Sequence, residues 1–433
     1  MTPPTHITPA ERSASTVAHG IRQMTGRDPE EKGRAATPLE LLFDLTFVVA
    51  FANAGNEMAH LVAAGHTWAG VAGFCFAIFG ITWAWINFSW FASAYDTDDW
   101  AYRLTTMVQM IGVVVFALGM PALFASIEHG EHVDNQILVL GYLIMRVAML
   151  TQWLRAARQC PQRTTCLTYA ASIALAQLGW VALAWATTSL VVFAVCSAVL
   201  VGIEFAGPYL AEKKEGGTPW NTHHIAERYS LLAIIALGEG VVGSVVSLGA
   251  AVSAEGWTME SALVALASMG LTFAMWWNYF GIDFAGILHA RRDRSFAFGY
   301  GHIPLFGAIA ALGAGLHIVA YYLEAHHDPE EYSWVTIGET GAVLAVAIPV
   351  LVFVITLFSL WAFLFRSPDK VHPITVTATC LVILASVWMA AAHVPISVAL
   401  IVLCFAPALV VVAYELYGHR HQARALAEQS TGH

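Results

Sequence analysis

Long apolar segments follow one another along almost the whole chain. Each runs for about 20 residues with few charged positions, which is the length that an α-helix needs to cross roughly 30 Å of hydrocarbon. Their boundaries are soft by a few residues. The pattern predicts an all-α fold with twelve transmembrane helices, which span residues 38–62, 68–92, 101–126, 135–155, 166–186, 188–207, 223–249, 258–282, 300–323, 335–364, 372–390 and 393–417.

The composition indicates an integral membrane protein. Of the 433 residues, 58% are hydrophobic and 12% are charged, which is about half the charged fraction of an ordinary globular domain. The mean hydropathy is +0.64. The six cysteines do not suggest a disulfide framework, because four lie in apolar segments and the others, Cys160 and Cys166, flank a loop on the expected inner side. The net charge of -10 gives nucleic-acid binding no support.

The positions of lysine and arginine predict which side of the membrane each loop faces. Cytoplasmic loops of membrane proteins carry an excess of these residues. All but one of the 20 basic residues lie in the N-terminal tail, in or beside the loops after even-numbered helices, or in the C-terminal tail. Both termini are therefore expected in the cytoplasm. The exception is Arg146, inside the fourth helix.

The order of the helices suggests a duplicated six-helix unit. Helices 2 and 8 carry related aromatic stretches, "WAWINFSWF" and "MWWNYFGIDF", in which Asn87 aligns with Asn278. Acidic, histidine-rich stretches follow helices 3 and 9. Two parallel repeats, related by an axis along the membrane normal, would explain both likenesses. The expected parts are a mobile cytoplasmic tail at 1–37, a first six-helix repeat at 38–212, a linker at 213–222, a second repeat at 223–417 and a cytoplasmic tail at 418–433.

An acid interrupts the most informative apolar segment, "HHIAERYSLLAIIALGEGVVG". At 3.6 residues per turn, this helix places four polar side chains on one face, namely His224, Glu227, Arg228 and Glu239. Glu239 lies near the bilayer centre, where an acid costs about 2.5 to 3.5 kcal/mol on insertion scales. It must therefore face protein, water or a cation. A structural hydrogen bond from a protonated carboxyl, a transport or proton-relay role and a catalytic role are the alternatives.

The first helix carries two acids at its inner end. Glu40 and Asp44 are four residues apart in "PLELLFDLTFVVAF", so they share a helical face. Glu40 alone could serve the helix N-terminus, where acids are favoured, whereas Asp44 lies a full turn deeper. Together with the polar face of the seventh helix, these acids suggest a vestibule in the cytoplasmic half of the membrane.

Arg146 is the one base that lies far from both ends of a predicted span, where an unpaired guanidinium would be expensive. We expect it to pair with Asp44, Glu204 or Glu239, and a purely structural ion pair would explain it as well. Glu204 precedes "FAGP", whose glycine and proline are expected to end the sixth helix. His302 lies close to the inner edge of the ninth helix.

The acidic loop "YDTDDWAYRL" has a structural explanation. Asp98 or Asp99 is expected to cap the third helix, and Arg103 is expected to pair back to one of them. Three acids in four residues could also bind a cation, but their spacing matches no calcium-binding loop. His223 and Glu227 lack the second histidine of a zinc-protease motif. The sequence therefore predicts no metal site and identifies no cofactor.

Several of these segments together resemble the bacterial low temperature requirement A family. They are "PLELLFDLTFVVAF", "YDTDDWAYRL", the arginine of "YLIMRVAML", "GIEFAGP", "HHIAERYSLLAIIALGEGVV", "WWNYF" and "YGHIP". The resemblance implies a multi-pass protein of the bacterial cytoplasmic membrane but no substrate, because the family name records a growth phenotype. It makes signature positions of Glu40, Asp44, Asp98, Arg103, Arg146, Glu204, His224, Glu227, Arg228, Glu239 and His302.

Buried acids, one buried base and a repeat favour an ion- or proton-coupled transporter or channel. The alternative is a membrane-embedded enzyme that acts on a lipid or small molecule with His, Glu and Arg as acid-base groups. A scaffold or sensor is the remaining class. The expected partners are the lipid bilayer and a small solute or ion. Whether the protein forms a homo-oligomer is left open. The predicted pathway residues are Glu40, Asp44, Arg146, Glu204, His224, Glu227, Arg228, Glu239 and His302.

Overall fold

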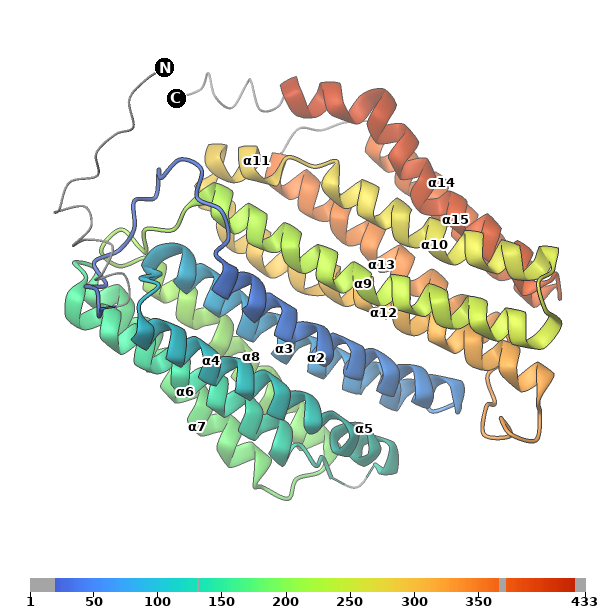
Figure 1. The fold of residues 1–433 in the computed structure, drawn as a ribbon, viewed down its shortest axis with the longest axis horizontal. Coiled ribbons are helices and arrows are strands. Elements are labelled where there is room, and N and C mark those ends of the chain that lie inside the picture. The colour runs from blue at the N-terminus through green and yellow to red at the C-terminus, as the bar shows by residue number, and fades with distance from the viewer. Residues whose placement is uncertain (1–19, 131, 366–370, 425–433) are drawn as a thin grey trace, which may run out of the picture.

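The structure is a computed structural model that describes residues 20–130, 132–365 and 371–424 (Figure 1). Within these ranges the regular secondary structure is helical, and 12 stretches are long and apolar enough to cross a membrane, which confirms the predicted fold class. The α-helices are α2 (Pro38–Ala63), α3 (Thr67–Tyr95), α4 (Trp100–Leu118), α5 (Met120–His129), α6 (Gln136–Gln159), α7 (Arg163–Ala184), α8 (Leu190–Glu212), α9 (Thr222–Glu255), α10 (Met259–Phe280), α11 (Phe284–Ala290), α12 (Ser295–His327), α13 (Glu339–Phe365), α14 (Val371–Ala391) and α15 (Ile396–Ala413).

Local sequence signals set several helix ends. α2 begins with a capping box, in which the Thr37 hydroxyl accepts from the Glu40 amide and the Glu40 carboxylate accepts from the Thr37 amide. The third span breaks at Gly119, after which a proline in the first turn starts α5. These caps satisfy backbone donors that a helix start leaves free.

One predicted helix end is wrong. α8 does not stop at Gly207 and Pro208 but runs through both to Glu212. Proline removes one backbone donor, and membrane helices tolerate this where neighbouring groups pack against the site. Gly207 lies directly against the side chain of Ser172 on α7, so this part of α8 is held by its neighbour.

α2 and α3 lie between two groups of helices (Figure 1). On one side, α4 packs against α6, α6 against α7 and α7 against α8. On the other side, α12 contacts α9 and α13 and also reaches α2 and α3, so it joins the two groups. The same order of contacts occurs in both halves of the chain. α9 contacts α10 as α2 contacts α3, and α13, α14 and α15 pack in succession as α6, α7 and α8 do. This order is what two parallel repeats would produce, and the duplication stays a prediction.

Residues 20–37 pack across the end of the bundle, which differs from the mobile tail expected for 1–37. Met24 is fully buried, and its amide donates to Gln159 Oε1 at 2.7 Å. The side chain of Asn221 donates to the carbonyl oxygen of Pro29 at 3.0 Å. The segment therefore contacts the end of α6 and the start of α9 together.

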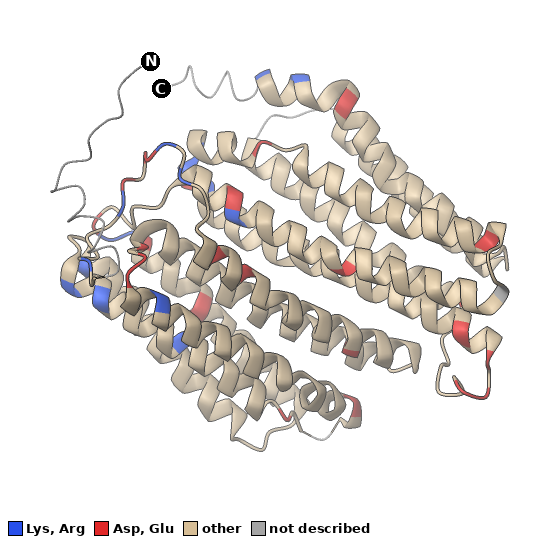
Figure 2. Ribbon diagram, viewed as in Figure 1, with Lys and Arg blue, Asp and Glu red and all other residues tan. Residues whose placement is uncertain are grey.

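The remaining parts of the two predicted tails lie outside the described residues, at 1–19 and 425–433. The last helical stretch continues to Arg424, beyond the predicted end at 417. Figure 2 shows that Lys and Arg gather at the end of the bundle that holds the N-terminal segment and the last helical turns, whereas the opposite end carries acids. The positions of the basic residues in space thus agree with their distribution along the sequence.

Candidate functional site

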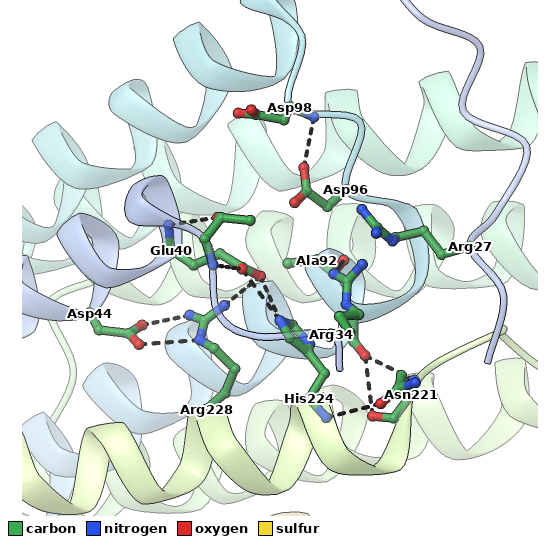
Figure 3. A network of polar contacts seen from close by, with 12 residues as sticks. Arg27, Arg34, Glu40, Asp44, Ala92, Asp96, Asp98, Asn221, His224 and Arg228 are labelled. Carbon is green, nitrogen blue, oxygen red and sulfur yellow. Dashed lines mark hydrogen bonds and ion pairs between the residues drawn. The ribbon is translucent and has the colours of Figure 1, made fainter. Parts of the chain in front are cut away.

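Arg228 of α9 is fully buried between two acids of α2 (Figure 3). Its Nη1 donates to Glu40 Oε1 at 2.8 Å, and its Nη2 and Nε donate to the two oxygens of Asp44 at 2.5 and 3.2 Å. The contact with Asp44 is bidentate, the arrangement in which the planar guanidinium matches a carboxylate best. Hydropathy groups Arg228 with an inner loop, but the structure places it inside the bundle.

His224 adds a contact to Glu40 one turn before Arg228. Its Nε2 lies 3.3 Å from Glu40 Oε2, while its buried Nδ1 has no hydrogen-bond partner in the described ranges. Asn221 caps α9 by accepting from the amide of His224 at 3.0 Å. The cap fixes the first turn, so both polar side chains of α9 point toward α2.

Aromatic rings of α3 surround this ion pair. Trp85 donates from Nε1 to Asp44 Oδ1 at 2.6 Å. The guanidinium carbon of Arg228 lies 5.6 Å from the ring centroids of both Trp85 and Phe88, within the distance of a cation–π contact. Three helices therefore meet at one buried cluster, which we call the Arg228 cluster: Glu40, Asp44, Trp85, His224 and Arg228.

A second buried guanidinium lies beside Glu40. Arg34 donates from Nη2 to the carbonyl oxygen of Ala92 at 2.8 Å, and its Nε and Nη1 have no hydrogen-bond partner among the described residues. Burial lowers the pKa of Arg34, and the nearby charge of Arg27 lowers it further. Arg34 belongs to a stretch whose polar composition gives no sign of burial, so the sequence offered no signal for it.

Arg146 and Glu204 form a separate ion pair within the first group of helices. Arg146 Nη2 donates to Glu204 Oε2 at 2.7 Å, and both side chains are 2% exposed. The predicted pairing of Arg146 is confirmed, with Glu204 as the partner. Glu204 also accepts from Trp83 Nε1 at 2.9 Å, the Tyr142 hydroxyl at 2.8 Å and Gln177 Nε2 at 3.3 Å. Four donors thus hold one carboxylate of α8.

His302 lies on α12, fully buried among aromatic rings. Its Nδ1 is 2.7 Å from the carbonyl oxygen of Phe298, and its Nε2 is 3.1 Å from the hydroxyl of Tyr279. A neutral ring with its proton on Nδ1 donates to the carbonyl and accepts from the hydroxyl, which satisfies both nitrogens. The structure therefore places His302 in the packing of α9, α10 and α12, where the ring of Tyr229 lies between it and Trp85 of the Arg228 cluster.

Glu239 lies apart from both ion pairs, near the middle of the span Thr222–Ala254. Its side chain is 9% exposed. Among the described residues it has no hydrogen bond and no ion pair. α9 comes close to α12 here, because a Cβ on Gly313 would lie 2.8 Å from the Cβ of Glu239. The carboxylate is thus confined beside a tight helix contact without a fixed partner.

Glu227 does not join its predicted neighbours. It is half-buried and makes no hydrogen bond or ion pair with any residue that the structure describes. The four residues that an ideal helix places on one face therefore do not form one site. His224 and Arg228 bind the acids of α2, whereas Glu227 and Glu239 each lie apart from them. Trp85 is a contributor that sequence reasoning noted only as part of the repeat. The available signal was its indole N–H, which needs an acceptor when it is buried.

The loop between α3 and α4 behaves as a structural cap. The side chain of Asp99 caps α4 by accepting a hydrogen bond from the amide of Tyr102, and it also forms an ion pair with Arg155. Arg103 pairs with Asp98 at 2.8 Å. Both expectations for this loop are confirmed. Asp98 adopts a φ of 47°, a left-handed conformation that aspartate tolerates better than most residues.

Two acids of this loop have opposite pKa shifts. Burial, together with the nearby charge of Glu40, raises the pKa of Asp96 to about 6. Burial also opposes ionisation of Asp99, but hydrogen bonds from Arg155 and from backbone amides outweigh it and hold the pKa of Asp99 below its usual range. Asp96 therefore gains a proton in mildly acidic conditions, whereas Asp99 stays ionised.

Replacing Arg146 tests the ion pair between Arg146 and Glu204. Arg146→Leu leaves the Glu204 carboxylate buried without its base, so we expect a loss of about 3–5 kcal/mol in the free energy of unfolding. Thermal unfolding of the detergent-purified protein measures this loss, and Arg146→Leu combined with Glu204→Leu should recover part of it. Arg103→Leu, which breaks an exposed pair, should cost less than about 1 kcal/mol. Equal melting temperatures for Arg146→Leu and the wild type would contradict this role.

Asp96→Asn should change how stability depends on pH. With a folded pKa raised from 3.8 to about 6, the folded protein holds the Asp96 proton more tightly than the unfolded chain. The wild type should therefore lose stability relative to Asp96→Asn as the pH rises through this window, by on the order of 2–3 kcal/mol. Melting temperatures of both proteins from pH 4 to pH 7 give the difference.

Asp99→Asn is the control with the opposite sign. Because the pKa of Asp99 is lowered, its ionised form stabilises the fold above the unfolded pKa and loses that effect as the pH falls. The deficit of Asp99→Asn should therefore be largest near neutral pH. A difference between the wild type and Asp96→Asn that stays constant over the whole range would rule out the raised pKa.

Comparison with known proteins gives the family. An uncharacterized protein of Rhizobium meliloti (strain 1021) is 25% identical to this chain over 305 residues, which are 67% of this chain and 70% of the relative. No solved structure matches the chain. The family model described as bacterial low temperature requirement A protein (LtrA) matches residues 35–407, a range that contains both ion pairs, Glu239 and His302. The chain therefore belongs to the bacterial low temperature requirement A family.

Proposed function

We propose that this protein is a proton- or cation-coupled transporter or channel of the bacterial cytoplasmic membrane. The observation that carries the proposal is Glu239, a carboxyl group in the middle of a spanning helix with no basic partner among the described residues. An ionised acid at this depth costs about 2.5 to 3.5 kcal/mol. A proton or a cation must therefore accompany it, and exchange of that proton or cation is the elementary step of a coupled pathway.

The two buried ion pairs set Glu239 apart. Arg146 neutralises Glu204, and Arg228 lies between the acids of α2. Changing the charge of either pair would break several hydrogen bonds, so these groups serve to hold helices together. Glu239 can change its charge without breaking a contact. This freedom is what a proton relay or an ion-binding group in a membrane pathway requires.

Hydroxyl groups continue from Glu239 along α9 and α10. Ser244 and Ser247 follow it on α9, and the Oγ of Ser247 lies 3.2 Å from the Oγ of Ser268 on α10. Thr272, one turn further along α10, donates to the carbonyl oxygen of Ser268 at 3.2 Å. Hydroxyls both donate and accept, so a row of them can pass a proton or bind a cation. These residues support a pathway between α9 and α10 on one side of Glu239.

The Arg228 cluster supports an inner gate on the other side of Glu239. It joins α2 to α9 and hence one predicted repeat to the other, and transporters built from repeats move one repeat against the other around a central site. The Nδ1 of His224, which has no hydrogen-bond partner in the described part of the chain, offers a position for a proton that enters from this end. We assign Arg146, Glu204 and His302 to the packing around the pathway, and Glu227 to its mouth.

A membrane-embedded enzyme, the other class raised by the sequence, gains no specific observation. His224 and Arg228 bind the acids of α2, and Arg146 binds Glu204. These groups hold one another, and their geometry points to no substrate that they would act on. The transport proposal therefore remains the one that a particular residue favours.

Both termini should lie in the cytoplasm, because the basic end of the bundle holds the described chain ends. Cys160 and Cys166 are poor reporters of this topology, since both are buried with their sulfurs 3.4 Å apart. A cysteine-free variant with Lys213→Cys should react only with a membrane-permeant maleimide in intact cells, whereas Trp257→Cys, at the other end, should react with an impermeant one. The reverse pattern would overturn the proposed orientation.

Glu239→Gln tests the function itself. The amide keeps the shape and hydrogen bonding of the carboxyl group but cannot ionise, so the protein should stay folded while flux falls by about tenfold or more. Proteoliposomes with a pH-sensitive dye and imposed H⁺, Na⁺ or K⁺ gradients measure the flux. Glu330→Gln, which changes an exposed loop acid, should leave it unchanged. Full flux in Glu239→Gln, with only lower stability in Glu239→Leu, would make Glu239 a structural residue.

A further inference from the structure

An aromatic cavity, with about 460 Å³ of empty space that includes open solvent, lies between the two groups of helices. Residues of α3, α6, α7, α8 and α12 and of the loop before α9 line it. The residues that matter for its chemistry are the aromatic side chains Trp83, Trp90, Trp153, Tyr169, Trp220 and Tyr300, and the carboxylate of Glu212.

The polar edges of four of these rings are already bound elsewhere. Trp83 donates to a carboxylate of α8 at 2.9 Å, Trp90 to a tyrosine hydroxyl of α9 at 3.0 Å and Tyr300 to a backbone carbonyl of α8 at 3.1 Å. Tyr169 donates to Glu212 at 2.8 Å. The N–H and O–H groups of these rings are therefore not free to donate to a ligand. What the rings can offer a ligand is their carbon, and the face of an aromatic ring carries the negative end of its quadrupole and attracts cations.

The rings hold one another in fixed positions. Trp153 stacks on Tyr169 with centroids 4.0 Å apart and an angle of 3°, and Trp90 meets Trp220 edge to face at 4.8 Å. Rings fixed in this way lose little freedom when a ligand enters. The cavity is thus preorganised for ligand binding.

Glu212 adds a negative charge to this aromatic wall. It accepts from the Tyr169 hydroxyl and from the Thr218 amide and hydroxyl at 2.8, 3.0 and 2.7 Å. It has no ion-pair partner among the described residues. Arg292 lies 4.1 Å from the ring centroid of Trp220 and donates to its carbonyl oxygen. It is close enough to Glu212 for the two charges to attract, but it forms no ion pair with Glu212 among the described residues.

We propose that this cavity binds an organic monocation, namely a quaternary or alkyl ammonium group, with Glu212 as its counter-charge and the tryptophan faces as its walls. An anion would meet Glu212 and the π faces, and neither attracts it. A metal ion would find a single carboxylate, which is fewer ligands than Ca²⁺ or Zn²⁺ takes in proteins. The ammonium group can belong to a free molecule or to a lipid headgroup. The inference stands whether or not Glu239 carries flux.

A second cavity supplies the matched control. It has about 530 Å³ and lies among α10, α13, α14 and α15, where Asn278 takes the place that Asn87 has in the first cavity. Among the described residues that line it, there is no Asp or Glu. Phe358 lines this second cavity only. A change there alters a cavity of similar size without touching the aromatic wall beside Glu212.

Calorimetric titration of the detergent-purified full-length protein with choline tests the proposal. Glu212→Gln should raise the Kd for choline about tenfold. Trp220→Leu should raise it about fivefold to thirtyfold, whereas Trp220→Phe, which keeps an aromatic face, should retain most of the affinity. Phe358→Leu should leave the Kd unchanged. Melting temperatures of all four variants establish that each is folded.

The charge and the source of the ligand are tested separately. The neutral isostere 3,3-dimethyl-1-butanol should bind at least about tenfold more weakly than choline, because it lacks the cation. A short-chain phosphatidylcholine that binds where choline does not would identify a lipid headgroup as the source, provided that phosphatidylglycerol of the same chain length fails to bind. Binding of neither choline nor phosphatidylcholine would overturn the proposal. Equal affinity for the neutral isostere, or an equal effect of Phe358→Leu and Trp220→Leu, would overturn it as well.

Discussion

The contact between the two halves of this protein depends on the buried guanidinium of Arg228. Removing an arginine from water costs several kcal/mol, which only well-placed carboxylates can offset. Both carboxylates lie on α2, at Glu40 and Asp44, so α9 can dock with one rotation and one height against α2. The caps at Thr37 and Asn221 fix the helix starts from which these side chains project. The other contacts between α2 and α9 depend on this rotation and height.

Much of the architecture could be predicted from hydropathy, and the positions of single charges could not. A spanning helix must satisfy its own backbone and expose apolar side chains, so α2 was expected at 38–62 and runs over Pro38–Ala63. Arg228 was expected at the inner edge of the seventh helix without a partner, because a local sequence cannot distinguish a base at the headgroups from one paired with an acid 184 positions away. For Arg146 the sequence reduced the partner to three acids, and the packing of α6 against α8 selects Glu204.

The two cavities allow the two halves of the protein to be compared. Asn87 and Asn278, which a sequence likeness aligns, each line a cavity. The second, fourth, fifth and sixth spans of the corresponding half line each cavity, and α12 of the other half also lines the one that holds Asn87. This correspondence supports the proposed duplication. The contents differ, since one cavity has Glu212 and four tryptophans, while the other has Trp361 stacked on His372. The two places that the predicted duplication would make equivalent therefore differ in chemistry.

The packed N-terminal segment has a consequence for how the protein is made. It leaves the ribosome before both of its partners, Gln159 at the end of α6 and Asn221 at the start of α9. The segment cannot close over the bundle until α9 has been synthesised. Until then Glu40 and Asp44 lack Arg228, so a truncated chain keeps unpaired acids within the membrane. A chain that ends before α9 is therefore expected to be less stable than the finished protein, because two buried acids lack their base.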